Sequence, residues 1–427
     1  MQVIKKYFVE DFSSDLKAGF ITAVVALPLA IGFAIASGVH PVMGLYTAVI
    51  AGFLGSLIGG SRFSVTGPTG AMTVLILSTL NKYGVEGVLL AGLIAGVIQL
   101  LFGLIKVGKF VKFIPLPIIS GFTAGIGVLI FIGQIPNFLG ISIKSHEFIG
   151  DTFIEIGKSI PSANLTAILI SVFTFSILMF LPKIFSHIKF LKAVPASIIA
   201  LVVTTVFAYF YAARMGIPTV GEIPSSLPSF NMVNIDWHLV KEILPSAFTI
   251  ALLGAIEALL CAVVSDGMTG TKHNSNKELV AQGIVNMIVP FFGGIPATAA
   301  VARTAVNIRE GAKTRIAGMI HALILLLTIL FFAPVAKYIP KSFLAGILMF
   351  VSLKMINIRE IWTILHLSKS ETLGLLITLS LTVLTDLVFA VEVGFVFAVI
   401  LVFIRLINEI QITHHEDIDN SHSKRHI

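Results

Sequence analysis

Two ionisable side chains stand in apolar stretches of the sequence, where an isolated charge is unfavourable. Glu257 lies in the apolar run 252–260, and no charged residue precedes it for over ten positions. Arg303 follows Pro296 by less than two turns of helix, in a second apolar run. Inside a membrane an ionised carboxylate needs a proton, a cation or an opposite charge, whereas a buried guanidinium attracts anions. These residue types predict an anion bound near Arg303 and a proton carried by Glu257.

Each of these residues also has a structural interpretation. Glu257 and Arg303 could form a structural ion pair, or Glu257 could be a permanently protonated packing residue. Arg303 could instead extend to the inner membrane surface or bind a backbone carbonyl group. His321 lies in another apolar run, and it is more typical of a hydrogen-bonded core histidine than of a proton relay.

The stretch 64–72 is typical of a membrane helix that is broken. It contains two glycines, a proline and three hydroxyl side chains, and the apolar run 72–80 that follows is long enough for only about half a bilayer. Unwound backbone at membrane depth must be buried in protein or line a cavity. A half-helix that starts near Pro68 would direct its free N–H groups and positive dipole end into that cavity, which favours an anion. An ordinary loop between two short helices is the alternative.

A second broken segment occurs at the corresponding place in the other half of the chain. At a constant offset that aligns Ala18 with Ala247, Thr69 falls on Thr298, and both broken segments follow glycines and precede short apolar runs. This pattern predicts an inverted repeat whose two half-helices point at each other across one site. The substrate-binding candidates at the two helix starts are Thr69, Gly70, Ala71, Ala299, Ala300, Val301 and Arg303.

Composition identifies the class of protein that positions these residues. Of 427 residues, 56% are hydrophobic and only 12% are charged, against about 25% charged residues in soluble domains. The sequence therefore predicts an all-α polytopic membrane protein with fourteen transmembrane segments in a seven-plus-seven inverted repeat, broken at segments 3 and 10. The predicted spans lie at about 16–37, 43–59, 66–80, 86–105, 114–133, 163–181 and 195–213, and then at about 243–265, 278–292, 297–308, 315–335, 342–356, 371–385 and 389–407.

The distribution of charge predicts the orientation in the membrane. Lys and Arg concentrate in the loops that this topology places in the cytoplasm, which puts both termini inside. Residues 1–15 lack a signal-peptide pattern and are expected to be a cytoplasmic segment, and residues 408–427 a short cytoplasmic tail. The net charge of +7 is spread over many short loops, so no nucleic-acid partner is expected. The single cysteine, Cys261, excludes an internal disulfide framework.

Several motifs then match a known family in the right order. They are Pro41 to Tyr46, Gly67-Pro68-Thr69-Gly70, Leu253 to Glu257, Asp266-Gly267 with Lys272 to Leu279, and Gly293 to Pro296 with Ala302-Arg303-Thr304. Over about residues 12–407 the sequence resembles the sulfate permease family of anion transporters. The resemblance implies a core domain (about 16–105 and 243–335) that moves against a gate domain (about 110–213 and 342–407). It also implies that the first span adds Leu29 and Phe33 to an anion site between spans 3 and 10.

Two departures from the family pattern affect the expected mechanism. Family members usually carry a regulatory domain of the sulfate transporter and anti-sigma factor antagonist type, and the tail after Leu406 is too short for it, so a homodimer is possible but not through that domain. Sodium-coupled bicarbonate transporters of the family look to have Asp and Thr where this chain has Glu257 and Cys261. A thiol is a poor ligand for a hard cation, so a proton is favoured over sodium as the coupling ion.

The sequence thus predicts a transporter of the cytoplasmic (inner) membrane, without enzymatic activity, cofactor or metal. It would move a small oxyanion, namely bicarbonate, sulfate or a dicarboxylate, together with protons by alternating access. A sodium-coupled bicarbonate symporter, or an uncoupled exchanger or channel on the same fold, are the alternatives. A nucleobase transporter of this architecture is less suitable, since the half-helix starts offer mainly backbone N–H groups, which fit a compact anion.

Overall fold

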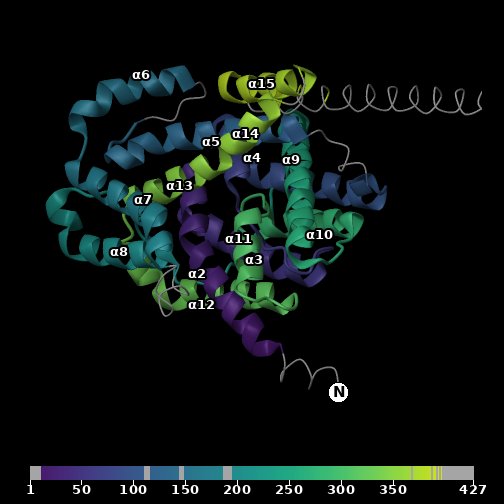
Figure 1. Ribbon diagram of the computed structural model, residues 1–427, viewed down its shortest axis with the longest axis horizontal. Coiled ribbons are helices and arrows are strands. Elements are labelled where there is room, and N and C mark those ends of the chain that lie inside the picture. The colour runs from purple at the N-terminus through teal and green to yellow at the C-terminus, as the bar shows by residue number, and fades with distance from the viewer. Residues whose placement is uncertain are drawn as a thin grey trace, which may run out of the picture.

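The computed structural model describes residues 11–109, 116–143, 149–185, 195–366 and 369–385, together with 388–390, 393 and 396. Helices dominate this part of the chain (Figure 1). The first half contains α2 (Phe12–Ala36), α3 (Pro41–Ile58), α4 (Gly70–Leu104), α5 (Leu116–Leu139), α6 (Ile149–Ser159), α7 (Leu165–Phe185) and α8 (Ala196–Met215). The second half contains α9 (Trp237–Thr269), α10 (Ser275–Ile288), α11 (Val301–Arg309), α12 (Ile316–Ala336), α13 (Lys341–Met355), α14 (Ile358–Leu365) and α15 (Lys369–Leu384).

The predicted spans and the observed helices correspond closely. Helix α4 contains most of the two predicted spans 66–80 and 86–105, as two helical parts joined by a kink at Gly84, where the backbone is not helical. Gly84 has φ 70° and ψ −173°, a conformation that glycine adopts without a Cβ penalty. The last predicted span, 389–407, lies largely outside the described residues. Within the described ranges, nine helices are long and apolar enough to cross a membrane.

The two broken segments differ in detail from the prediction. Helix α4 begins at Gly70 rather than near Pro68, and α11 begins at Val301. Before them lie two short strands that the prediction of an all-helical chain did not include, β1 (Thr66–Gly67) and β2 (Thr298–Ala299). They pair antiparallel with the register Thr66↔Ala299 and Gly67↔Thr298. Pairing satisfies extended backbone that would otherwise lack partners at membrane depth.

The N-caps of the half-helices correct the predicted correspondence between the halves. Thr69 is the N-cap of α4, and Ala300 is the N-cap of α11. The residue that occupies the place of Thr69 in the second half is therefore Ala300, whereas Thr298 belongs to the preceding strand. A constant offset fails here because the second broken segment is longer between its proline and its helix start.

The helices pack in two groups, which we name by their members. The central bundle consists of α2, α3, α4, α9, α10, α11 and α12, where α4 packs against α9 and α10, and α12 packs against α2 and α3. The lateral bundle consists of α5, α7, α8, α13 and α15, where α5 packs against α13 and α15. Figure 1 shows α7 and α8 on one side of the molecule and α9 and α10 on the other. The two bundles touch chiefly where α13 meets α2 and where α4 meets α5.

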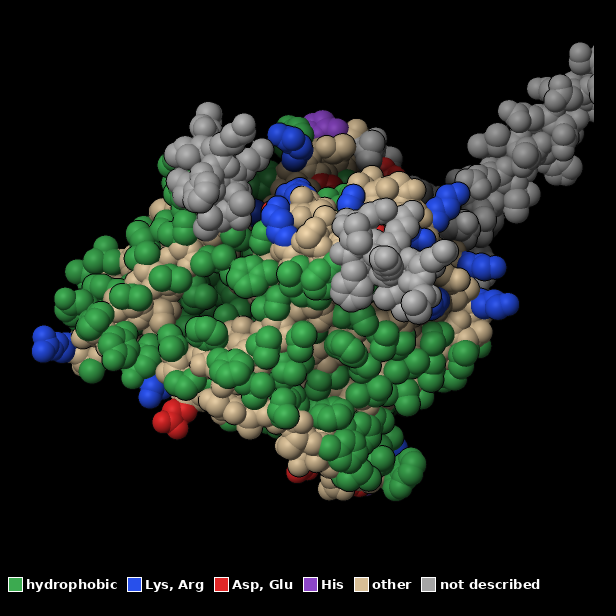
Figure 2. Space-filling view, turned by 90° about the horizontal axis from the view of Figure 1, so that it is seen from below, with side chains coloured by type: hydrophobic (Ala, Val, Ile, Leu, Met, Phe, Trp, Pro, Cys, Tyr) green, Lys and Arg blue, Asp and Glu red, His purple; other side chains and the backbone are tan. Residues whose placement is uncertain are grey.

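The outer surface is that of a protein surrounded by lipid. Large apolar side chains stand exposed on α7, α8 and α12, among them Leu169, Phe210 and Phe331. Figure 2 shows a broad apolar surface, with most of the visible Lys and Arg side chains along one edge of it. Apolar side chains in this arrangement match the hydrocarbon layer, and basic side chains match its polar boundary. The chain is a multi-pass membrane protein.

Candidate functional site

Each half-helix starts just after one of the two paired strands, and we call this place, formed by β1, β2 and the starts of α4 and α11, the crossing. The N–H of Ala300 donates to the carbonyl oxygen of Val65 at 2.9 Å, which extends the strand pairing up to the N-cap residue of α11. Neither N-cap side chain hydrogen bonds to its helix: Thr69 bonds elsewhere, and Ala300 has no polar side-chain atom. No N-cap side chain therefore occupies the first-turn N–H groups of these helices, and the positive end of each helix dipole is available to a ligand.

Side chains from neighbouring helices hold the extended backbone. Asn286 on α10 accepts a hydrogen bond from the N–H of Ala297 at 2.8 Å and donates to its carbonyl oxygen at 2.9 Å. The hydroxyl of Thr304 accepts from the N–H of Val65 at 3.0 Å, and that of Thr47 accepts from the N–H of Ile295 at 2.7 Å. These contacts explain how the chain leaves the helical conformation inside an apolar protein. Sequence reasoning missed Asn286, although an amide within the apolar run 278–292 was a signal.

We expect Asn286→Ala to lower the free energy of unfolding by more than the loss of the packing contacts of Asn286 alone would. The substitution leaves both polar groups of Ala297 without this partner, and each unsatisfied buried group costs about 1–3 kcal/mol. Thermal unfolding of the purified protein in detergent measures the effect as a lower Tm. Asn231→Ala is the matched control, since Asn231 bonds only to Ser229 through its side chain in an exposed loop. Equal Tm values for the two variants would contradict the role assigned to Asn286.

Arg303 is buried behind the first half-helix. Arg303 is 1% exposed, and Nη2 donates to the carbonyl oxygen of Pro68, while Nη1 has no hydrogen-bond partner within the part of the chain that the structure describes. A Cβ on Gly67 would lie 2.5 Å from Nη1, so the glycine leaves the space that the guanidinium occupies. The interpretation in which Arg303 extends to the membrane surface is wrong, because the side chain is buried. The expected hydrogen bond from Arg303 to a backbone carbonyl group is present, at Pro68. From this position the guanidinium adds positive charge behind the N-terminus of α4.

Glu257 and Cys261 lie one turn apart on α9 and both contact the crossing. Glu257 Oε2 accepts a hydrogen bond from the hydroxyl of Thr69 at 2.9 Å. The charge of Arg303 acts on Glu257 electrostatically, but the carboxylate bonds to Thr69 rather than pairing directly with the guanidinium. Cys261 is buried and its Sγ lies 3.2 Å from the hydroxyl oxygen of Thr304. Thr69 therefore links the carboxylate of Glu257 directly to the start of α4.

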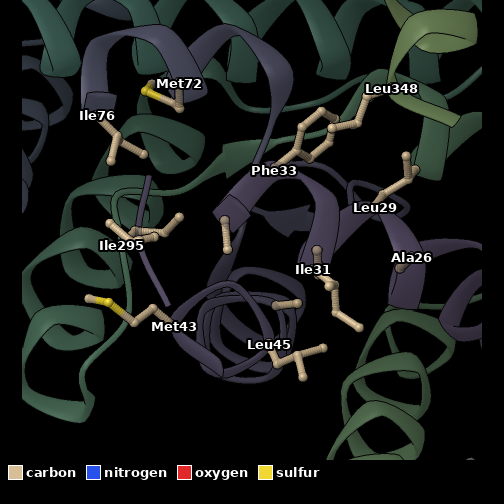
Figure 3. Close-up of a cluster of buried hydrophobic side chains, with 14 of the residues drawn as sticks. Ala26, Leu29, Ile31, Phe33, Met43, Leu45, Met72, Ile76, Ile295 and Leu348 are labelled. Carbon is tan, nitrogen blue, oxygen red and sulfur yellow. The ribbon is translucent and has the colours of Figure 1, made fainter. Parts of the chain in front are cut away.

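The other predicted residues border the contact between the two bundles. A Cβ on Gly70 would lie 3.0 Å from Ile130 Cδ1 on α5, 3.2 Å from Met355 Sδ on α13 and 3.4 Å from Phe33 Cε1 on α2. Figure 3 shows Phe33 of α2 pointing toward Leu348 of α13. Leu29, also on α2, lies nearby. The start of α4 thus faces the lateral bundle.

The remaining helix-start residues differ in exposure. Ala71 and Ala299 are buried, whereas Val301 is 41% exposed. The structure therefore brings the predicted residues of α2, α4, α9 and α11 around one place, with Val301 on its accessible side. Among the described residues, no group of three or more His, Cys, Asp and Glu side chains could hold a metal ion.

Comparison with known proteins gives the following matches. A sequence model of the sulfate permease family matches residues 12–378. The putative sulfate transporter YvdB of Bacillus subtilis is 44% identical over 417 residues, which are 97% of this chain and 77% of the relative. The bicarbonate transporter BicA of Picosynechococcus sp. is 34% identical over 423 residues, covering 96% of this chain and 73% of the relative.

Solved structures give the same result at the level of the fold. The transmembrane domain of a cyanobacterial bicarbonate transporter BicA superposes with a TM-score of 0.78 at 35% identity, covering 89% of this chain and 97% of that one. The murine solute carrier 26 family member A9, an anion transporter in the inward-facing state, superposes with a TM-score of 0.84 at 20% identity. That second match covers 93% of this chain and 69% of the other, and it supports the fold alone.

Proposed function

Because this chain belongs to the sulfate permease family, we propose that it is a secondary active transporter of a small oxyanion, namely bicarbonate, sulfate or a dicarboxylate. The observation that carries the proposal is the antiparallel pairing of β1 and β2. It brings together two half-helix starts without side-chain caps, in front of the buried Arg303. Backbone N–H groups, helix dipoles and one fixed cation suit a compact anion. The members of this family are transporters, and the proposed activity is transport without chemical conversion.

In the proposed transport cycle the central bundle is a core domain that moves against the lateral bundle, the gate domain. Leu29, Phe33, Thr69, Gly70, Ala71, Ala299, Ala300 and Val301 would contact the anion or border its path, and Arg303 would act on it electrostatically. Leu348 on α13 packs against α2 near Phe33, so this surface must slide or open when the bundles move. Alternating access of this kind is common in inverted-repeat transporters. The membrane would be the cytoplasmic membrane, with both termini inside and a homodimer as one possible assembly.

We propose further that Glu257 carries the coupling proton. The carboxylate lies within reach of both the first half-helix, through Thr69, and the field of Arg303. Cys261, one turn away, offers sulfur where sodium would need oxygen, so sodium coupling is the less favoured alternative. An uncoupled exchanger is the second candidate, since the bond between Thr69 and Glu257 could also serve only to hold α9 against α4.

Uptake by purified protein in liposomes tests the proposed function. Labelled bicarbonate, sulfate and succinate are offered in turn, each with a pH gradient, a sodium gradient or no gradient. The proposal expects accumulation of at least one of these anions when the outside is acidic, whether or not sodium is present. Accumulation only with sodium would identify a sodium symporter, and exchange without accumulation would identify the uncoupled alternative.

Arg303→Gln is expected to weaken anion binding about tenfold, which corresponds to about 1.4 kcal/mol. Glutamine keeps a donor for the Pro68 carbonyl group but removes the charge. Binding to the purified protein is measured by calorimetry, and Tm is measured in parallel. Arg315→Gln is the matched control, since Arg315 also donates to a backbone carbonyl, that of Gly59, but away from the crossing. Unchanged binding by Arg303→Gln would remove the electrostatic role of Arg303.

A further inference from the structure

The chain passes between the central and lateral bundles through short connections, and two of these connections lie side by side. Among the described helices, the chain changes bundle between α4 and α5, between α8 and α9, and between α12 and α13. The first of these connections lies partly outside the described residues. The second, residues 216–236, runs in irregular structure, and we call it the strap. The third is the four-residue turn 337–340.

The first part of the strap pairs with the turn 337–340. Thr219 and Pro340 lie opposite each other in an antiparallel bridge. Two backbone hydrogen bonds of 2.9 Å, donated by Val220 and Lys341, flank this bridge, and the N–H of Gly221 donates a third, of 3.3 Å, to the same turn. Two of the connections between the bundles are therefore joined to each other. We call the paired residues, 218–221 and 337–341, the joint.

Contacts with α7 and α8 fix the joint to the lateral bundle. The ring of Tyr338 packs edge-on against that of Tyr209 on α8, with 4.9 Å between the ring centroids. Asn164, just before α7, donates to the carbonyl oxygens of Met215 at 2.7 Å and Gly216 at 3.1 Å, which holds the end of α8 where the strap begins. The joint therefore belongs to the lateral bundle, although the turn 337–340 continues directly from α12 of the central bundle.

The second part of the strap is held by the central bundle. The ring of Phe230 stacks on that of Phe291, which follows α10, with 5.5 Å between the ring centroids and an angle of 8° between the planes. The N–H of Asn231 donates to the carbonyl oxygen of Phe291 at 2.6 Å. The hydroxyl of Tyr46 on α3 donates to the carbonyl oxygen of Ser226 at 3.3 Å. From Ser226 onward the strap is therefore fixed to the central bundle.

Residues 222–225 connect these two fixed parts of the strap. Among the described residues, none forms a hydrogen bond with residues 222–225, and of these four only Ile223 is buried. Gly221, the last strap residue of the joint, has φ 84°, a conformation that favours glycine. The chain from Gly221 to Ser226 spans at most about 18 Å when it is fully extended. This segment can therefore bend, but it limits how far its two ends can separate.

We propose that the joint is a hinge, in which the two connections stay paired and move with the lateral bundle while the strap bends at residues 221–225. The inference rests on the proposed function, in which the central bundle moves against the lateral bundle. Hinges are commonly a few loop residues that absorb a large change in φ and ψ. The bundles are then tied at the joint throughout the transport cycle, and the reach of the bend limits their movement there.

Gly221→Ala tests the bend without changing a side-chain contact. A Cβ there would meet no atom within 4 Å, so alanine only restricts the backbone at a positive φ. In liposomes, turnover at saturating anion should fall at least fivefold, while the Kd for the anion stays within twofold of the native value. Gly270→Ala, at the end of α9, is the matched control, since Gly270 has φ 71° and a Cβ there also meets nothing within 4 Å. Equal turnover of the two variants, or lost anion binding in Gly221→Ala, overturns the proposal.

A disulfide across the joint tests whether the two connections stay paired. The hydrogen bonds beside Thr219 and Pro340 make them a non-hydrogen-bonded pair, whose Cα atoms typically lie about 4.5 Å apart, within the range of a disulfide. The native Cys261 is buried and does not compete. The double variant Thr219→Cys with Pro340→Cys, once oxidised, should keep at least half the uptake rate of its reduced form. A loss of uptake that a reductant reverses would show that the joint opens, which overturns the proposal.

A second disulfide separates this inference from the proposed function. The double variant Gly32→Cys with Leu348→Cys ties α2 to α13, since a Cβ on Gly32 would lie 3.3 Å from Cγ of Leu348. Oxidation of this pair should abolish uptake, and a reductant should restore it. If uptake survives oxidation of both pairs, the bundles do not move against each other, and the proposed transport cycle fails together with the hinge. If oxidation of either pair abolishes uptake, the proposed movement stands and only the hinge fails.

Discussion

Gly70→Leu is expected to abolish anion uptake while the protein remains folded and monodisperse. Gly70 is the first residue of α4, and its missing side chain leaves space that borders Phe33, Ile130 and Met355. Even one methyl group there would come within 3.0 Å of Ile130 Cδ1. A leucine would therefore fill the space in front of the half-helix and wedge between the two bundles, which blocks both the anion and the proposed movement. Uptake into liposomes and size-exclusion chromatography measure the two effects.

The matched control for this prediction is Gly133→Leu. Gly133 lies on α5, the helix that carries Ile130, but a Cβ there would meet no atom within 4 Å. The control should transport like the native protein. A second variant, Ala300→Leu, blocks the corresponding start of α11 and should behave like Gly70→Leu. Normal uptake by both Gly70→Leu and Ala300→Leu would show that the anion does not pass between the two half-helices.

Much of the fold follows from local features of the sequence. Apolar runs bounded by Gly, Pro and charged residues predicted the helices, because in lipid the backbone satisfies its hydrogen bonds within each helix. The two breaks were predictable for the same reason, since Gly67, Pro68 and Pro296 do not continue a helix in an otherwise apolar run. Glu257 and Arg303 stood out because a charge in an apolar run has few explanations. The structure brings both toward the start of α4.

The tertiary contacts of the site were not predictable from one sequence. Whether Arg303 points toward the anion or behind the half-helix depends on the space left at Gly67, which lies far away in the chain. The pairing of Thr66 with Ala299 depends in the same way on two segments that meet only in the fold. Asn286 and His321 looked like minor polar residues in apolar runs. Only the fold shows that Asn286 bonds to both backbone polar groups of Ala297, whereas neither ring nitrogen of His321 has a hydrogen-bond partner among the described residues.

The other large effect is expected at Glu257, where Glu257→Gln should retain anion binding and exchange but lose accumulation driven by a pH gradient. Glu257 Oε2 accepts a hydrogen bond from the hydroxyl of Thr69, and the positive charge of Arg303 acts on the same carboxyl group. An anion that arrives near Arg303 offsets its charge and so raises the proton affinity of Glu257. Anion and proton then bind with positive coupling, and each strengthens the binding of the other by the same factor.

Glutamine removes the titrating group but preserves its size and its ability to accept a hydrogen bond from Thr69, so the anion site should stay intact. Uptake is measured in liposomes that are acidic outside, with and without sodium, and counterflow exchange is measured without a gradient. Glu242→Gln is the matched control, since Glu242 lies on the same helix but is exposed and pairs with His238 at its surface. If Glu257→Gln still concentrates the anion on a pH gradient, the proton binds elsewhere, and Glu257 serves only to hold Thr69 and α4 in place. If the native protein accumulates the anion only with sodium, the site near Glu257 and Cys261 binds sodium instead of a proton. The argument that the Cys261 thiol disfavours a hard cation is then overturned.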